Sequence, residues 1–158
     1  MKLKTRVFVA ISGGVDSAVA VAILLDQGFL VTGIHMQTWH DPAMTVGSQY
    51  SHNLKDRAQH TAKSLNIPFI SLDIREKFFN QVVQSFINQY LAGLTPNPCL
   101  FCNPQQKWGV LQSYALDQGA DYFATGHYAR IEHHASDSAR LFRGKDKTKD
   151  QSYVLSML

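Results

Sequence analysis

Short apolar runs of strand length alternate with longer stretches of helical periodicity along this chain. The apolar runs contain β-branched and aromatic side chains and are bounded by turn residues. They predict four strands, at residues 7–11, 30–36, 68–72 and 122–124. The stretches between them predict helices at residues 16–27, 54–65, 78–91 and 103–118. Strands separated by helices form parallel sheets, so we expect an α/β fold with a doubly wound, mostly parallel sheet.

Three of the predicted helices carry additional signals. Residues 16–27 are apolar almost all round, which predicts a buried helix. Residues 78–91 carry one apolar face, which we interpret as core packing without a further function. Asn103 followed by Pro104 matches the N-cap and first position of a helix, so we expect the fourth helix to begin there.

Chemically distinctive segments follow three of the predicted strands. Residues 12–17 follow the first strand, Met36 closes the second, and residues 125–127 follow the fourth. Ligands of doubly wound sheets bind beyond the carboxyl ends of the strands. We therefore expect these three segments to form one site.

The composition is that of a single folded domain. The chain has 158 residues, of which 45% are hydrophobic and 17% charged. No apolar run is long enough to cross a bilayer, and no signal-peptide core follows the basic start, so we expect a cytoplasmic protein without a membrane partner. The apolar segment 153–158 lacks turn residues, so we expect a longer parent chain to continue beyond it.

Positive charge is concentrated in the last quarter of the chain. The whole chain carries a net charge of +3, but residues 140–149 alone hold five Lys or Arg side chains against one Asp. Such a segment either binds phosphates or is a solvated loop. Residues 128–132 and 140–143 predict a hairpin around the polar residues 133–138.

Residues 12–17, S-G-G-V-D-S, join the first strand to the first helix. Glycines allow close approach of the backbone, helix N-terminal amides favour anions, and the serine hydroxyls add donors. The loop therefore predicts a phosphate site, in which Asp16 is suited to hold Mg²⁺. Its spacing differs from that of a Walker A loop. A glycine turn without a ligand is the competing interpretation.

Cys99 and Cys102 form a C-x-x-C pair. In a cytosolic protein this spacing suggests redox, metal or catalytic work more than a disulfide. It leaves room for a zinc or iron–sulfur ligand pair, although two ligands do not complete a site. Cys102 directly precedes the predicted helix start, where we expect the dipole and free amides to lower the pKa of its thiol. An inert buried cysteine is the competing interpretation.

The phosphate loop resembles the PP-loop of ATP pyrophosphatases, which split ATP between the α and β phosphates and adenylate a carbonyl oxygen. Three later motifs are T-P-N-P with C-N within residues 95–103, A-T-G-H-Y at 124–128 and K-D-Q-S-Y at 149–153. In this order they resemble the tRNA-specific 2-thiouridylase family (MnmA, also called TrmU). The resemblance implies that residues 1–158 form its PP-loop catalytic domain, of the adenine nucleotide alpha-hydrolase-like (HUP-type) fold. The family's central and C-terminal tRNA-binding domains are absent from this chain.

The resemblance implies adenylation of O2 of the wobble uridine in tRNA by ATP, with Mg²⁺, and its replacement by sulfur from a cysteine persulfide that a sulfur-donor protein supplies. Cys102 would be the catalytic nucleophile. The implied nucleotide contacts are Ala10, Ile11, Ser12, Gly13, Gly14, Val15, Asp16, Ser17, Met36 and Gly126. The implied contacts to the target base and the tRNA are Asn97, Pro98, Cys99, His127, Lys149, Asp150 and Gln151. For His127, a capping or core histidine is the competing interpretation.

The chain departs from the family pattern in two respects that bear on the reaction. Many relatives have aspartate at the position of Cys99, and the family's second cysteine, which accepts the persulfide, lies in a region that this chain does not contain. Two other functions therefore stay open. One is a PP-loop ligase that forms an amide or amine, and the other is an ATP- or tRNA-binding fragment without catalysis. The family has also been labelled a methyltransferase, but nothing in the sequence suggests a methyl-donor site.

Overall fold

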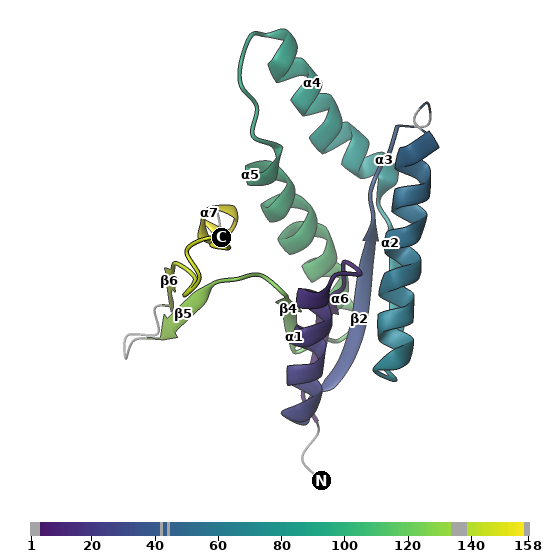
Figure 1. Ribbon diagram of the computed structural model, residues 1–158, viewed down its shortest axis with the longest axis vertical. Helices are drawn as coiled ribbons and strands as arrows, with labels where there is room; N and C mark the ends of the chain where they lie inside the picture. Colours follow the sequence, from purple (N-terminus) through teal and green to yellow (C-terminus); the bar gives the residue numbers. More distant parts are fainter. Residues whose placement is uncertain (1–3, 42, 44, 134–138, 157–158) are drawn as a thin grey trace.

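A four-stranded parallel sheet forms the centre of the protein (Figure 1). The computed structural model describes residues 4–41, 43, 45–133 and 139–156. The strands lie in the order β3-β2-β1-β4. They are β1 (Arg6–Ala10), β2 (Leu30–Gln37), β3 (Phe69–Asp73) and β4 (Tyr122–Thr125). Each predicted strand is confirmed, and its ends agree to within about one residue.

Helices cover both faces of this sheet, and alternate side chains of β1 pack against the helices on opposite faces. Val7 and Val9 belong to the core that includes residues of α1 (Val15–Asp26) and α2 (Thr45–Ser64). Phe8 instead packs against Ala115 of α6 (Gln112–Asp117). The prediction of a doubly wound sheet is therefore confirmed. The strand order reverses between β1 and β4, which pair directly.

Two helical stretches connect β3 to β4. The first comprises α3 (Arg75–Phe78), η1 (Phe79–Val83) and α4 (Gln84–Leu91), where η marks π-helical turns. The second comprises α5 (Pro98–Cys102), η2 (Asn103–Leu111) and α6. After β4 come the predicted hairpin, with β5 (Arg130–His133) paired to β6 (Ala139–Phe142), and the short α7 (Ser152–Leu155). Residues 134–138 of the predicted turn lie outside the described residues.

Two predictions of buried helix faces were wrong in part. On α1, Val15, Val19 and Ile23 are 73%, 49% and 52% exposed, because only one side of this helix contacts the sheet. On the stretch 78–91, Val82 is buried but Tyr90 is 68% exposed. Figure 1 shows the reason, since α4 extends beyond the end of the sheet. Among the described residues, no helix is both long and apolar enough to span a bilayer.

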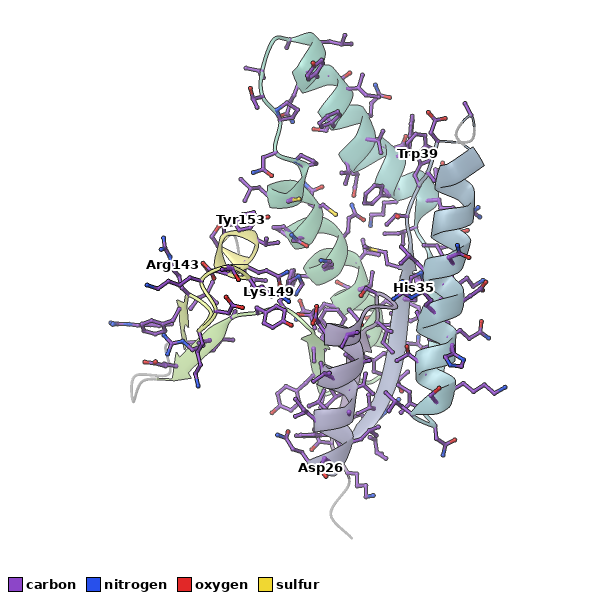
Figure 2. All side chains as sticks on the ribbon, viewed as in Figure 1. Asp26, His35, Trp39, Arg143, Lys149 and Tyr153 are labelled. Carbon is purple, nitrogen blue, oxygen red and sulfur yellow. The ribbon has the colours of Figure 1, made fainter. Side chains whose placement is uncertain are left out.

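A buried histidine connects β2 to the loop that follows β1. His35, labelled in Figure 2, is 6% exposed, and its Nδ1 lies 2.9 Å from the carbonyl oxygen of Ile11. Because a carbonyl accepts only, Nδ1 carries the proton and donates. Burial lowers the pKa of His35 below 6.5, so the imidazole is neutral at pH 7. This bond holds Ile11, the residue directly before the phosphate loop, against β2.

The central strand can be tested by truncating one fully buried side chain. Val9 is 0% exposed, so Val9→Ala leaves a cavity in the core, and we expect it to lower the free energy of unfolding by about 2 kcal/mol. Val19→Ala removes the same atoms from a half-exposed position and is the matched control, with an expected change below about 0.5 kcal/mol. Urea unfolding monitored by circular dichroism measures both. Equal losses would contradict the assignment of Val9 to the core.

The buried His35 predicts a pH dependence of stability. Its folded pKa is depressed, whereas the unfolded chain binds the proton at the ordinary value near 6.5. The stability that it contributes is therefore complete above that value and is lost as the pH falls through it. We expect the difference in unfolding free energy between the wild type and His35→Asn to narrow from pH 7 to pH 5. A difference that stays constant over this range would show that His35 is not the responsible group.

Candidate functional site

A cleft of about 340 Å³ lies at the point where the strand order reverses. The three strand-end segments that were expected to meet line it together. Of the predicted nucleotide contacts, the cleft is lined by Ala10, Ile11, Ser12, Asp16, Ser17, Met36 and Gly126. Gly13, Gly14 and Val15 instead line a second hollow between the loop and α2. Several other lining residues, among them Lys107 and His35, were not predicted from the sequence.

Hydrogen bonds between its own residues hold the phosphate loop in shape. The Ser17 hydroxyl donates to the Gly14 carbonyl at 3.0 Å, and the Ser12 hydroxyl accepts from the Gly14 amide at 3.3 Å. Gly13 has a φ of +82°, and a Cβ there would lie 2.8 Å from the carbonyl oxygen of Leu54. The N–H groups in the first turn of α1 have no intrahelical acceptors, so they are available to an anion.

Gly126 is needed because two backbone segments approach each other closely. A Cβ on Gly126 would lie 2.7 Å from the amide nitrogen of Ser17 and 2.8 Å from the carbonyl oxygen of Asp16. Neither neighbour is a flexible side-chain end, so a larger residue would displace the backbone. Gly126 was expected to approach a nucleotide. In the structure, its small size lets the segment after β4 pack against the start of α1.

Tyr128 contacts Asp16, the one acidic residue among the predicted contacts to the nucleotide. Its hydroxyl donates to Oδ1 of Asp16 at 2.5 Å, and this bond, with the charge of Asp16, raises the pKa of Tyr128. Asp16 also lines the cleft, and this bond uses one of its two carboxylate oxygens. The sequence signal for Tyr128 was its position directly after His127 in A-T-G-H-Y.

The predicted helix start at Asn103 was wrong. Helix α5 begins at Pro98 with Asn97 as N-cap, and Asn103 has helical angles of −65° and −56°. Its side-chain amide donates to the carbonyl of Cys99 at 3.0 Å, so it bonds within the helix rather than capping it. Both Asn-Pro dipeptides match the capping pattern, and the first of them starts the helix.

The corrected helix start changes the environment of both cysteines. Exposed Cys99 lies in the first turn, whereas Cys102 is the last residue of α5 and is partly buried. Burial raises the pKa of the Cys102 thiol, and the charge of Lys107 acts in the opposite direction. The expectation that the helix N-terminus lowers this pKa was therefore wrong. The described residues assemble no group of three or more His, Cys, Asp or Glu side chains that suits a metal ion.

Lys107 lines the cleft and contacts His127. Its Nζ lies 3.2 Å from Nε2 of His127, and Nδ1 of His127 lies 2.7 Å from the hydroxyl of Thr125. Burial and the nearby ammonium lower the pKa of His127 to about 4, so the ring is neutral at pH 7. The structure thus places His127 in the wall of the cleft, next to the ring of Trp108 at 5.5 Å.

The predicted tRNA-contacting residues come from segments that are distant in the sequence. Asn97 and Cys99 are exposed at the start of α5, whereas the basic segment lies just before α7. In that segment Lys149 is exposed, whereas Asp150 accepts bonds from the amides of Gly144 and Ser152 at 3.1 Å. Gln151 reaches the cleft, and its Oε1 accepts from the amide of Tyr128 at 3.0 Å. Arg143 and Lys149 lie between β6 and α7 (Figure 2).

Comparisons with known proteins agree with this architecture. Residues 5–158 match the family described as tRNA methyl transferase HUP domain. The tRNA-specific 2-thiouridylase MnmA of Natranaerobius thermophilus is 44% identical over 167 residues, which cover 100% of this chain and 45% of that protein. The MnmA of Geotalea uraniireducens is 45% identical over 161 residues, which cover 98% of this chain and 43% of that protein.

A solved structure gives the same fold. It is the predicted subunit of tRNA methyltransferase from Methanocaldococcus jannaschii, with a TM-score of 0.54 and 21% identity over 84% of this chain and 60% of that one. At this identity the match concerns the fold alone. The chain spans a little under half the length of the curated relatives that it matches. The match over residues 5–158 shows that this chain belongs to the tRNA methyl transferase HUP domain family.

Proposed function

We propose that this chain is the ATP-binding, adenylating domain of a tRNA-specific 2-thiouridylase. The observation that carries the proposal is the meeting of the phosphate loop, Met36 and the segment after β4 in one cleft. Lys107, five residues after Cys102 on the same helical stretch, also lines this cleft. The similarity to curated 2-thiouridylases over the whole chain supports the same function.

The cleft suits a nucleoside triphosphate because of its hydrogen-bond donors and its position at the edge of the sheet. The first turn of α1 and the loop hydroxyls offer donors for phosphate oxygens, and Met36 offers an apolar surface for the adenine. Asp16 would hold a Mg²⁺ ion, which neutralises phosphate charge. In the adenylation, O2 of the uridine attacks the α phosphorus of ATP and pyrophosphate leaves. The neutral His127 and the Lys107 ammonium line the space where the adenylate forms.

The second half of the proposed reaction uses the thiol region. The outer sulfur of the carrier's cysteine persulfide adds to C2 of the activated uridine, and AMP leaves with the former O2. The Cys102 thiolate then attacks the inner sulfur of the resulting C2–S–S linkage, which releases 2-thiouridine and leaves a disulfide between Cys102 and the carrier cysteine. The neighbouring Asn97, Pro98 and Cys99 are proposed to contact the target base. Pro98 fixes the start of α5, so this short segment is rigid next to the thiol.

The basic segment is proposed to bind the tRNA backbone. Arg143 and Lys149 are exposed, and Asp150 fixes the loop between them through the amides of Gly144 and Ser152. We assign Asp150 to shaping this loop and Lys149 to phosphate contact, with Gln151 linking the loop to the cleft. Binding through such cations weakens as salt rises.

Substrate-dependent pyrophosphate release tests the proposed function. The chain is incubated with ATP and Mg²⁺ and with unmodified tRNA, xanthosine monophosphate or small carboxylates. We expect pyrophosphate release only in the mixture that contains tRNA, because the proposed acceptor is a uridine oxygen. Release with a carboxylate or with the mononucleotide instead of tRNA would contradict the proposal and identify a ligase.

Cys102 is tested in the same mixture with a persulfide donor, by mass spectrometry of the tRNA nucleosides. Cys102→Ser is expected to abolish 2-thiouridine while ATP affinity stays within about twofold of the wild type, since the thiol lies outside the phosphate loop. Cys99→Ser replaces the exposed cysteine of the pair in the same way. It is the matched comparison for loss of thiolation that any Cys→Ser replacement in this segment would cause. Thiolation retained by Cys102→Ser would remove Cys102 from the reaction.

Gly126 provides a test of the cleft that is independent of tRNA. Gly126→Ala forces the segment after β4 away from Asp16 and Ser17, which displaces the first turn of α1. We expect the Kd for ATP to rise about tenfold or more. Gly144→Ala is the control, because its Cβ would meet no heavy atom closer than 3.6 Å. Isothermal titration calorimetry measures both, and equal affinities would show that ATP does not bind at this end of α1.

A further inference from the structure

Tyr128 contacts both the phosphate loop and the basic segment, and the proposed reaction assigns it no role. It is 39% exposed, and its hydroxyl donates to Oδ1 of Asp16 at 2.5 Å. Asp16 lies in the first turn of α1 and lines the cleft. The hydrogen bond and the charge of Asp16 raise the pKa of Tyr128, so the hydroxyl stays protonated and remains a donor at neutral pH. The segment after β4 thus reaches the phosphate loop through a side-chain hydrogen bond.

Gln151 holds the backbone of Tyr128 from the other side. The amide of Tyr128 donates to Oε1 of Gln151 at 3.0 Å, and the amide of Gln151 donates to the carbonyl of Tyr128 at 3.4 Å. Two bonds in opposite directions fix the orientation of Tyr128 relative to Gln151. A displacement of Gln151 is therefore passed to the Tyr128 backbone, and from there to the hydroxyl on Asp16.

Gln151 ends the basic segment, which folds back on itself. The carboxylate of Asp150 accepts the amide of Gly144 at 3.1 Å. A Cβ on Gly144 would lie 3.7 Å from the carbonyl oxygen of Tyr128, so both ends of this loop lie next to the tyrosine. Three exposed lysines lie between these ends, at positions Lys145, Lys147 and Lys149. A phosphate chain such as an RNA backbone is the ligand that such a row of cations attracts.

A ligand on this loop has a physical route to the cleft. Exposed loops with few anchoring bonds open at a low cost in free energy. A phosphate chain that bridges the lysines restricts the loop, and the two bonds to Gln151 extend this restriction to Tyr128 and Asp16. A second ligand that needs an ordered Asp16 then loses less entropy when it binds. The two ligands therefore favour each other's binding, and the effect is equal in both directions.

We propose that Tyr128 is a positioning residue that couples the basic segment to the phosphate loop, so that RNA phosphates on the segment tighten ATP binding in the cleft. This inference deepens the proposed function and rests on it for the RNA contact of the basic segment. Coupling between two binding events does not require the reaction to occur. It is therefore measured with an RNA that contains no uridine.

The test compares the Kd of ATP with and without saturating poly(A), by isothermal titration calorimetry in a Mg²⁺ buffer of low ionic strength. Poly(A) carries the phosphate chain, but adenine has no carbonyl oxygen that could be adenylated. For the wild type we expect poly(A) to lower the Kd of ATP at least about fivefold. Tyr128→Phe lacks just the hydroxyl on Asp16, and for this variant we expect a change of less than about twofold.

A second variant breaks the same link on the other side of Tyr128. Gln151→Ala removes the acceptor of the Tyr128 amide, and it should also reduce the effect of poly(A) to less than about twofold. Tyr122→Phe removes the hydroxyl of another exposed tyrosine, on β4, and is the matched control that should keep the full effect. Thermal unfolding identifies a variant that does not fold, and the other variant then carries the test. Equal effects of poly(A) in Tyr128→Phe, Gln151→Ala and Tyr122→Phe would overturn the proposal.

The place where the RNA binds is checked by fluorescence anisotropy with poly(A). Replacement of Lys145, Lys147 and Lys149 together by Gln should weaken poly(A) binding about tenfold. An unchanged affinity would contradict both this inference and the proposed tRNA contact of the basic segment. Coupling that is lost in Tyr128→Phe, in a protein that releases no pyrophosphate with tRNA, would support the inference while contradicting the proposed function. Pyrophosphate release with tRNA, together with unaltered coupling in Tyr128→Phe, would do the reverse.

Discussion

The site depends on how closely the segment after β4 approaches the start of α1. Direct pairing of β1 with β4 brings the ends of both strands to the same edge of the sheet, and the missing side chain of Gly126 lets the backbone come within van der Waals contact of Asp16 and Ser17. That contact places the phosphate loop and His127 around one cleft and brings Tyr128 to Asp16. Parallel strands provide such an edge only where their order reverses.

Much of this arrangement could be predicted because the sheet is buried on both faces. Buried parallel strands are near-continuous apolar runs, and the predicted strands agree closely with those of the structure. The loop at residues 12–17 was predicted for the same reason, since a glycine-rich turn directly after a strand has few other uses. The position of the cleft follows from these two features.

The thiol region was less predictable, because local patterns there are ambiguous. Two Asn-Pro dipeptides satisfy the same capping rule, and only tertiary packing selects between them. Asn103 is 4% exposed and bonds to the carbonyl of Cys99, so burial keeps it inside a helix despite the proline that follows. The contact of Lys107 with His127 joins residues that are distant in the sequence, and no spacing rule indicates it.

Apolar faces were overestimated for a related reason. Periodicity identifies the side of a helix that is able to pack, but it does not show how far the sheet extends beneath it. The stretch 78–91 is buried at Val82 and exposed at Tyr90, where α4 extends beyond the strands.

The π-helical turns of η2 decide how this helix responds to a change in its length. A wide turn holds one residue more than an α-helical turn over nearly the same rise, so deletion of a single residue between Pro104 and Leu111 would let that turn tighten to an α-helical one. The residues before the deletion would then keep their orientation relative to the sheet. Deletion of a residue from α6, whose turns are already α-helical, would instead rotate everything before it about the helix axis by roughly 100°. A single deletion is therefore tolerated better in η2 than in α6.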